Sequence, residues 1–216
     1  MKTIKQIFIK FSIILNDVLI NYIILIINKL KAKIYDKVAS FRTSNIVMFG
    51  NSLTAGGKWN ADLNRFDIKN SGTVGFTSSH FVWILDSAVI KYKPKICFIE
   101  GGINDIGVGI PLSRTYENYE LIVDTLIINK IEPVLQSTLY INQPDDSVSN
   151  SKVDSLNYFL SNLAAKRKIT FLDLNQFLSA NKRLKMEYTI DGVHIKKNAY
   201  KIWTHEIAKI LKNKGI

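Results

Sequence analysis

Strand-like and helix-like segments alternate along the chain from residue 45 onward. The predicted strands lie at residues 45–49, 67–70, 95–100, 133–139 and 169–174, and the first of them is a short apolar stretch typical of a buried strand. Segments with helical periodicity lie between or after them, at residues 77–92, 116–129, 151–166 and 197–212. Because strands joined through helices run parallel with right-handed crossovers, this order predicts a mainly parallel sheet with helices on both faces. The expected fold class is therefore α/β, with three layers and five strands.

Several side chains in these segments are expected to cover the sheet or to begin a helix. In the segment 116–129, we expect Ile122, Leu126 and Ile127 to face inward. Ser151 is the expected N-cap of the helix that follows it, since serine is a favoured capping residue. Other residues are predicted to be packed in the interior, namely Cys97 and the three tryptophans Trp59, Trp83 and Trp203, of which Trp59 could also line a substrate edge.

Composition favours one folded domain with a basic surface. The chain has 216 residues, of which 47% are hydrophobic, enough for one sizeable core. We expect a hydrophobic helix at residues 1–40 and a single folded domain at residues 41–216. The formal net charge of +11 is compatible with attraction to anionic surfaces such as acidic glycans or phospholipid headgroups, but we favour the alternative, a solvated lysine-rich surface without such a partner. Because the lysines are scattered rather than gathered into one basic run, we predict no specific binding of nucleic acid.

The first 34 residues differ from the rest of the chain, because residues 7–27 are mostly isoleucine, leucine, phenylalanine and valine. This stretch is long enough to cross a bilayer, but Lys10 and Asp17 lie on one narrow polar stripe of the helix that it predicts. Three interpretations stay open: a transmembrane anchor, a helix lying in the membrane interface, and a helix packed on the protein or on a second subunit. We favour membrane association through residues 1–34, on an unknown side, over a cytoplasmic location.

The first predicted strand leads into a glycine-rich turn that carries Ser52. A serine between a strand and a helix is exposed at the edge of the sheet, and the helix N-terminus there favours negative charge. Its hydroxyl is a weak nucleophile until a neighbouring base takes the proton. Ser52 could instead be the N-cap of the helix, but its position after an apolar strand, between Gly50 and Gly56, favours a nucleophile.

Three histidines are available as the base: His80, His194 and His205. His80 and His205 lie within predicted helices, whereas His194 follows a turn and has Asp191 three residues before it. One loop could then present the imidazole to Ser52 and a carboxylate to the imidazole. An unperturbed histidine has a pKa of about 6.5, so it can take up and release a proton near neutrality.

Other polar residues and glycines follow the second and third predicted strands. Gly72 and Gly75 follow the second strand, and Asn104 follows the third. Since ligands bind outside the carboxyl ends of parallel strands, these residues are expected to lie beside Ser52. Each also has a structural interpretation, the glycines as residues with positive φ and Asn104 as a turn residue. Asp105 is expected to hold its loop by hydrogen bonds rather than to catalyse.

Four short motifs resemble the conserved blocks of the SGNH (GDSL-type) hydrolases. They are Gly50-Asn51-Ser52-Leu53, residues 70–75, Gly102-Ile103-Asn104-Asp105 and Asp191-Gly192-Val193-His194, in that family's order. The resemblance covers residues 44–212, and the chain looks most like small bacterial esterases related to platelet-activating-factor acetylhydrolase. A flavodoxin-like sheet is implied by this likeness.

The resemblance also implies a role for each site residue. Ser52 would be the nucleophile, His194 the general base and then the general acid, and Asp191 the residue that orients the imidazole. The oxyanion hole would be formed by the N–H groups of Ser52 and Gly75 and by the side-chain amide of Asn104.

The chain is therefore expected to be a serine esterase that cleaves a short-chain acyl ester, acetyl above others, on a carbohydrate or a lipid. Asn51 stands where that family usually has aspartate, but this position is not the nucleophile. One alternative is an acyltransferase that uses the same residues with a sugar hydroxyl as acceptor. Another is a non-catalytic binding or membrane-tethering protein on the hydrolase scaffold. No cofactor is expected, and no metal, since no residues have metal-site spacing.

Overall fold

The computed structural model describes residues 27, 30 and 44–216. The predicted helix at residues 1–40 therefore lies almost entirely outside the described residues, and membrane association stays a prediction. Among the helices that are described, none combines the length and the apolar character needed to cross a bilayer.

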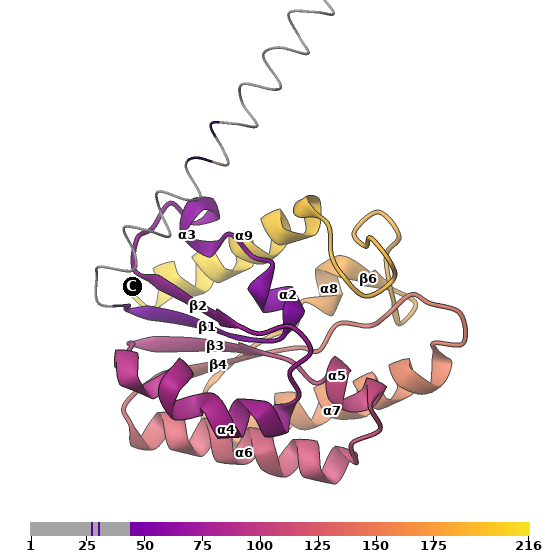
Figure 1. Ribbon diagram of the computed structural model, residues 1–216, viewed down its shortest axis with the longest axis horizontal. Coiled ribbons are helices and arrows are strands. Elements are labelled where there is room, and N and C mark those ends of the chain that lie inside the picture. The colour runs from indigo at the N-terminus through magenta and orange to yellow at the C-terminus, as the bar shows by residue number, and fades with distance from the viewer. Residues whose placement is uncertain (1–26, 28–29, 31–43) are drawn as a thin grey trace, which may run out of the picture.

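The described elements alternate between strands and helices, as Figure 1 shows. In chain order they are β1 (Ile46–Gly50), α2 (Ser52–Ala55), α3 (Trp59–Asp62), β2 (Ile68–Gly72), α4 (Ser78–Ala88), η1 (Ile90–Tyr92), β3 (Ile96–Glu100), α5 (Ile103–Gly107), α6 (Leu112–Ile128), β4 (Glu132–Gln136), α7 (Ser147–Arg167), β5 (Thr170–Leu172), α8 (Asn175–Leu178), β6 (Ser179–Ala180), β7 (Arg183–Leu184) and α9 (Lys197–Asn213). The five predicted strands are all present, each displaced by a few residues at most.

Five strands form one parallel sheet in the order β2-β1-β3-β4-β5. This order confirms the predicted parallel, flavodoxin-like arrangement. Its register brings Gly50, the last residue of β1, opposite Gly72 of β2 and opposite Glu100 of β3. The carboxyl ends of the three neighbouring strands therefore finish level with one another, and the loops that follow them share one edge of the sheet.

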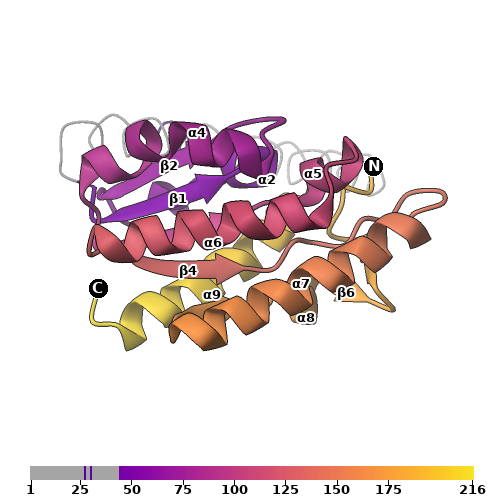
Figure 2. The same cartoon turned by 90° about the horizontal axis from the view of Figure 1, so that it is seen from below.

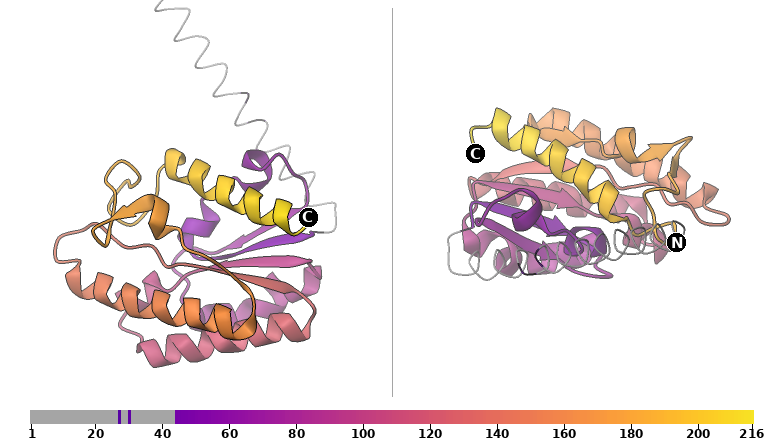
Figure 3. Two further views of the ribbon diagram at one scale, coloured as in Figure 1. Left: turned by 180° about the vertical axis from the view of Figure 1, so that it is seen from behind. Right: turned by 90° about the horizontal axis from the view of Figure 1, so that it is seen from above.

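Helices cover both faces of the sheet, which gives the three predicted layers (Figures 1 and 2). Successive strand residues point to opposite faces, and every residue of the central strands β1 and β3 is buried. In β1, Val47 and Phe49 pack with α4, α6 and α7, whereas Ile46 and Met48 pack with α2, α3, α8 and α9. Figure 3 shows α9 on the face opposite α6 and α7. The sheet is thus held rigidly between two apolar layers, which fixes the position of its carboxyl edge.

Several sequence-based expectations about individual residues were wrong. Ile127 is 41% exposed because it lies one position beyond the inward row of α6, in which Ile122 and Leu126 are buried. Trp83 is 80% exposed on α4 instead of packed. Ser151 lies inside α7, which begins four residues earlier, at Ser147.

Candidate active site

The turn after β1 places Ser52 at the first position of the short helix α2. Asn51, not Ser52, is the N-cap of this helix, since its side-chain Oδ1 accepts a hydrogen bond from the Leu53 N–H at 2.8 Å. The capping interpretation of Ser52 is therefore wrong. Because Asn51 satisfies the helix terminus, the Ser52 hydroxyl is left available for another partner.

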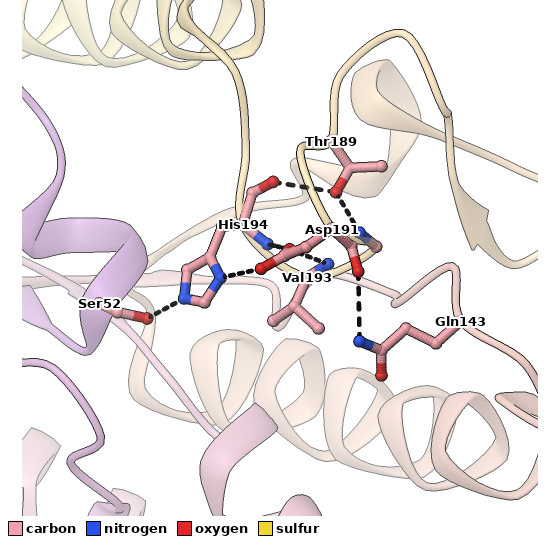
Figure 4. A network of polar contacts seen from close by, with 7 residues as sticks. Ser52, Gln143, Thr189, Asp191, Val193 and His194 are labelled. Atoms are coloured by element: carbon pink, nitrogen blue, oxygen red, sulfur yellow. Dashed lines mark hydrogen bonds and ion pairs between the residues drawn. The ribbon is translucent and has the colours of Figure 1, made fainter.

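That partner is His194, which comes from a loop 142 residues further along the chain. The Ser52 Oγ lies 3.2 Å from His194 Nε2, and His194 Nδ1 lies 2.7 Å from Asp191 Oδ2 (Figure 4). The three side chains form one continuous line of hydrogen bonds. The His194 and Asp191 side chains are about half exposed, at 48% and 50%, so water has access to this line.

Asp191 holds the shape of its own turn as well as the imidazole. Its Oδ1 accepts hydrogen bonds from the backbone N–H groups of Val193 and His194, at 2.9 and 2.7 Å (Figure 4). Burial works to raise the pKa of Asp191, but the hydrogen bonds from His194 and Val193 outweigh it and lower the pKa to about 2. The carboxylate therefore stays charged over the whole range in which enzymes are normally assayed. It can stabilise a positive imidazolium at His194.

A second loop, which follows β4, supports this turn from the side. Gln143 Nε2 donates to the Asp191 carbonyl at 3.2 Å, and the Asn142 N–H donates to the Gly192 carbonyl at 2.7 Å. Thr189 completes the turn, because its hydroxyl accepts from the Gly192 N–H and donates to the His194 carbonyl (Figure 4). The contacts of Asn142 and Gln143 could not be predicted from sequence, because each joins segments about 50 residues apart. The loop that contains these two residues has no sequence signal beyond its polarity.

The conformation of this turn requires glycine at position 192. Gly192 has a φ of +90°, and a Cβ placed there would lie 2.2 Å from the Asn142 carbonyl oxygen. Gly192→Ala is therefore expected to lower the free energy of unfolding by about 1–3 kcal/mol and to reduce turnover by displacing His194. Gly109→Ala is the matched control, because Gly109 has a φ of +78° but no atom within 4 Å of the added Cβ. Equal thermal melting shifts for the two variants would show that the contact with Asn142 is unimportant.

The predicted oxyanion residues lie at the same edge of the sheet. Gly75 is exposed, with a φ of +77°, in the loop that follows β2. The Asn104 side-chain amide donates to the carbonyl of Phe76, at 2.9 Å, so it is joined to the loop that contains Gly75. Neither the Ser52 N–H nor the Gly75 N–H donates a hydrogen bond to any group within residues 44–216. Their role as an oxyanion hole stays a proposal.

Asp105, next to Asn104, has the structural role expected of it. Its buried carboxylate accepts hydrogen bonds from the backbone N–H and the hydroxyl of Ser78 and from the hydroxyl of Thr115. These contacts tie α5 to the first turns of α4 and α6. Asp105 thereby fixes the helix α5, from which Asn104 extends.

The other two histidines have different surroundings. His80 lies in the first turn of α4, where its Nδ1 is 2.8 Å from the Thr77 hydroxyl and its ring stacks on Phe76. His205 is exposed on α9. His194 is thus the histidine that contacts Ser52, as predicted.

Two contacts that were not predicted from sequence fix the position of α2. The Tyr200 hydroxyl donates to the Leu53 carbonyl at 2.7 Å, and the indole N–H of the buried Trp59 donates to the Thr54 carbonyl at 2.9 Å.

Comparison with known proteins now decides the family. The model of the GDSL-like lipase/acylhydrolase family matches residues 48–202. The chain belongs to this family. Since that stretch contains Ser52, Asp191 and His194, this acylhydrolase carries all three residues within the matched region.

Solved structures of similar proteins agree with this assignment. A GDSL-like lipase from Bacteroides thetaiotaomicron is 27% identical, with a TM-score of 0.71 over 78% of this chain and 88% of that one. A Streptococcus pneumonia protein named after platelet activating factor is 23% identical, with a TM-score of 0.70 over 91% and 96% of the two chains. An acetylxylan esterase from Geobacillus stearothermophilus, at 16% identity and a TM-score of 0.64 over 76% and 92%, shares the fold.

Curated relatives are similar over a shorter stretch. An N-acylneuraminate cytidylyltransferase from Streptococcus agalactiae is 28% identical over 102 residues, which is 47% of this chain. The chain spans only about a quarter (24%) of the length of that relative.

Proposed function

We propose that this acylhydrolase is a serine esterase that removes short acyl groups, acetyl above others, from a carbohydrate. The observation that carries the proposal is the line of hydrogen bonds from Ser52 through His194 to Asp191. Such a line supplies a nucleophile, a base within reach of its proton, and a carboxylate that orients the base.

In the proposed reaction, His194 Nε2 takes the proton of Ser52 as Oγ attacks the ester carbonyl. The N–H groups of Ser52 and Gly75 and the Asn104 amide would stabilise the negative oxygen that forms. The imidazolium, stabilised by Asp191, then gives its proton to the leaving alcohol, and an acyl-enzyme remains on Ser52. Water, deprotonated by His194, attacks the acyl carbonyl, and the bond from Ser52 Oγ to the acyl group breaks. The imidazolium returns its proton to Oγ, and the carboxylic acid is released.

The exposure of the site favours hydrolysis over acyl transfer. The His194 and Asp191 side chains are about half exposed, so water can reach the acyl-enzyme without movement of a lid. Two of the connections at this edge are also short, since residues 73–77 join β2 to α4 and residues 101–102 join β3 to α5. A transferase that excluded water would need a more enclosed site.

Two observations support an acylated sugar as the substrate class. The fold is shared with an acetylxylan esterase, and the curated relatives are named for N-acylneuraminate, an acylated sugar acid. Of these two kinds of sugar, the formal net charge of +11 would favour the sugar acid, which is an anion.

Acetate release from a panel of esters tests the proposal. We expect the full chain in detergent to hydrolyse p-nitrophenyl acetate at least about tenfold faster than the octanoate, since a small exposed site gives little binding to a long chain. O-Acetylated xylooligosaccharide and an O-acetylated sugar acid are the carbohydrate arms, with ethylene glycol added to detect transfer. Folded protein that released no acid from any ester, or that preferred the octanoate, would refute the proposal.

A further inference from the structure

Glu100 lies buried beneath the turn that carries Ser52. It is the last residue of β3, pairs with Gly50 of β1, and is 0% exposed. The backbone is packed tightly here, because a Cβ on Gly50 would lie 2.4 Å from the Glu100 carbonyl oxygen and 2.2 Å from Thr54 Oγ1. The ends of β1 and β3 and the helix α2 therefore meet closely at Glu100.

The Glu100 carboxyl faces residues on either side of Ser52. The Thr54 hydroxyl, two residues after Ser52, donates to Glu100 Oε2 at 3.4 Å. The Asn51 amide, one residue before Ser52, is close enough to Glu100 to act on its pKa. Among the described residues, Asn51 Nδ2 and Glu100 Oε1 have no partner in good hydrogen-bond geometry. A buried donor and a buried acceptor thus lie at the base of the nucleophile's helix, where a small movement would pair them.

Among residues 44–216, no positively charged side chain pairs with Glu100. The ionisable groups that interact with it are the hydroxyls of Tyr119 on α6 and Tyr200 on α9, and Asp105 on α5 acts on the same Tyr119. Burial raises the pKa of Glu100 to about 8, although the hydrogen bond from Thr54 and the nearby amide of Asn51 work to lower it. The carboxyl is therefore mainly the neutral acid at pH 7.

We propose that Glu100 is a positioning residue whose neutral carboxyl fixes Asn51 and Thr54, and with them Ser52, and whose ionisation loosens the nucleophile's turn. The neutral acid keeps acceptor oxygens for the Thr54 hydroxyl and for the Asn51 amide, which flank Ser52, without placing a charge in the interior. A carboxylate in the same place would be a buried charge without a counterion, which the structure could relieve only by moving or by admitting water. This inference rests on the proposed esterase function, because Ser52 must be the nucleophile for its position to matter.

The pH profile of Glu100→Gln tests the proposal. Glutamine keeps a donor and an acceptor but cannot ionise, so kcat at pH 7 should stay within about threefold of the wild type. In the wild type, kcat should fall by about tenfold as the pH rises through about 8, with KM little changed, and this fall should be absent from Glu100→Gln. Glu117→Gln, on the exposed surface of α6, is the matched control. Superimposable profiles for wild type and Glu100→Gln would overturn the proposal.

Carbon-13 NMR of the wild type, labelled at its six glutamate carboxyl groups, gives a second measurement that needs neither the variant nor a substrate. One carboxyl resonance should titrate near pH 8 while the fold, followed by circular dichroism, stays intact. If every glutamate titrated near the usual pKa of about 4.3, the proposal would fail even in an active esterase. If one titrated near 8 in a protein without esterase activity, the proposed function would fail instead.

Discussion

Replacing Ser52 with alanine is expected to lower kcat/KM for acetyl ester hydrolysis by about 10³-fold or more. The Ser52 Oγ lies 3.2 Å from His194 Nε2, and alanine removes the atom that would form the acyl-enzyme. The remaining groups can still bind the ester and polarise its carbonyl, so a weak reaction with water is expected to persist. Initial rates with p-nitrophenyl acetate, measured after a circular dichroism check of folding, give this ratio.

Ser87→Ala is the matched control for that experiment. Ser87 is an exposed serine of α4 whose hydroxyl donates only to the Ile84 carbonyl of the same helix, at 3.0 Å. Its replacement should leave kcat/KM unchanged within about twofold, because surface substitutions of this kind have small effects. A Ser52→Ala variant that kept more than a tenth of the wild-type rate would mean that another group performs the reaction.

Asp191→Asn is expected to lower kcat by about 10³- to 10⁴-fold with a smaller effect on KM. The Asp191 carboxylate accepts the His194 Nδ1–H at 2.7 Å and so leaves Nε2 free to take the Ser52 proton. An asparagine amide pointed at Nδ1 would favour the opposite tautomer, which has its proton on Nε2 and cannot act as a base. The side-chain oxygen of asparagine can still accept from the N–H groups of Val193 and His194, so the turn should keep its shape.

Thermal melting of the wild type and of Asp191→Asn separates a wrong histidine tautomer from a general loss of folding. The pKa of Asp191 is lowered to about 2, so the carboxylate stabilises the fold above its unfolded pKa of about 4, and this effect is lost as the pH falls toward 2. Its side chain is half exposed, so the contribution to stability is small. The melting temperatures of wild type and Asp191→Asn should therefore be similar at pH 7 while the rates differ greatly. Asp145→Asn, an exposed aspartate in a loop, should match the wild type in both measurements.

The fold could be predicted from sequence because its central strands β1 and β3 are buried on both faces. A strand such as β1, in which all five residues are buried, reads as an unbroken apolar segment, and the helices between such strands dictate parallel pairing. Predictions of burial failed where the exact position of a side chain around a helix decides whether it is buried. Ile127 lies one residue past an inward position of α6 and is exposed, and Trp83 lies on the outer surface of α4. Periodicity locates a helix well but does not fix which borderline residues it buries.

The candidate site was predictable only in part, because some of its residues lie in short sequence motifs and others depend on how distant segments pack. Ser52, Asp191 and His194 lie in short motifs with the spacing that local turns require, so sequence could bring them together. Glu100 gave no such signal, since it resembles the polar end of a strand, and its burial depends on the packing of α2 over β3. Gln143 was also missed, because its contact with Asp191 depends on how two loops meet in space.

Peptide mapping after reaction with a fluorophosphonate probe tests the central claim most directly. Full-length protein is treated with the probe at pH 7, digested, and the modified residue is located by mass spectrometry. We predict one adduct, on Ser52, that is absent from Ser52→Ala and forms far more slowly in His194→Ala, while Ser87→Ala reacts like the wild type. An unmodified Ser52 in folded protein, or equally fast labelling of Ser52 without His194, would contradict the account.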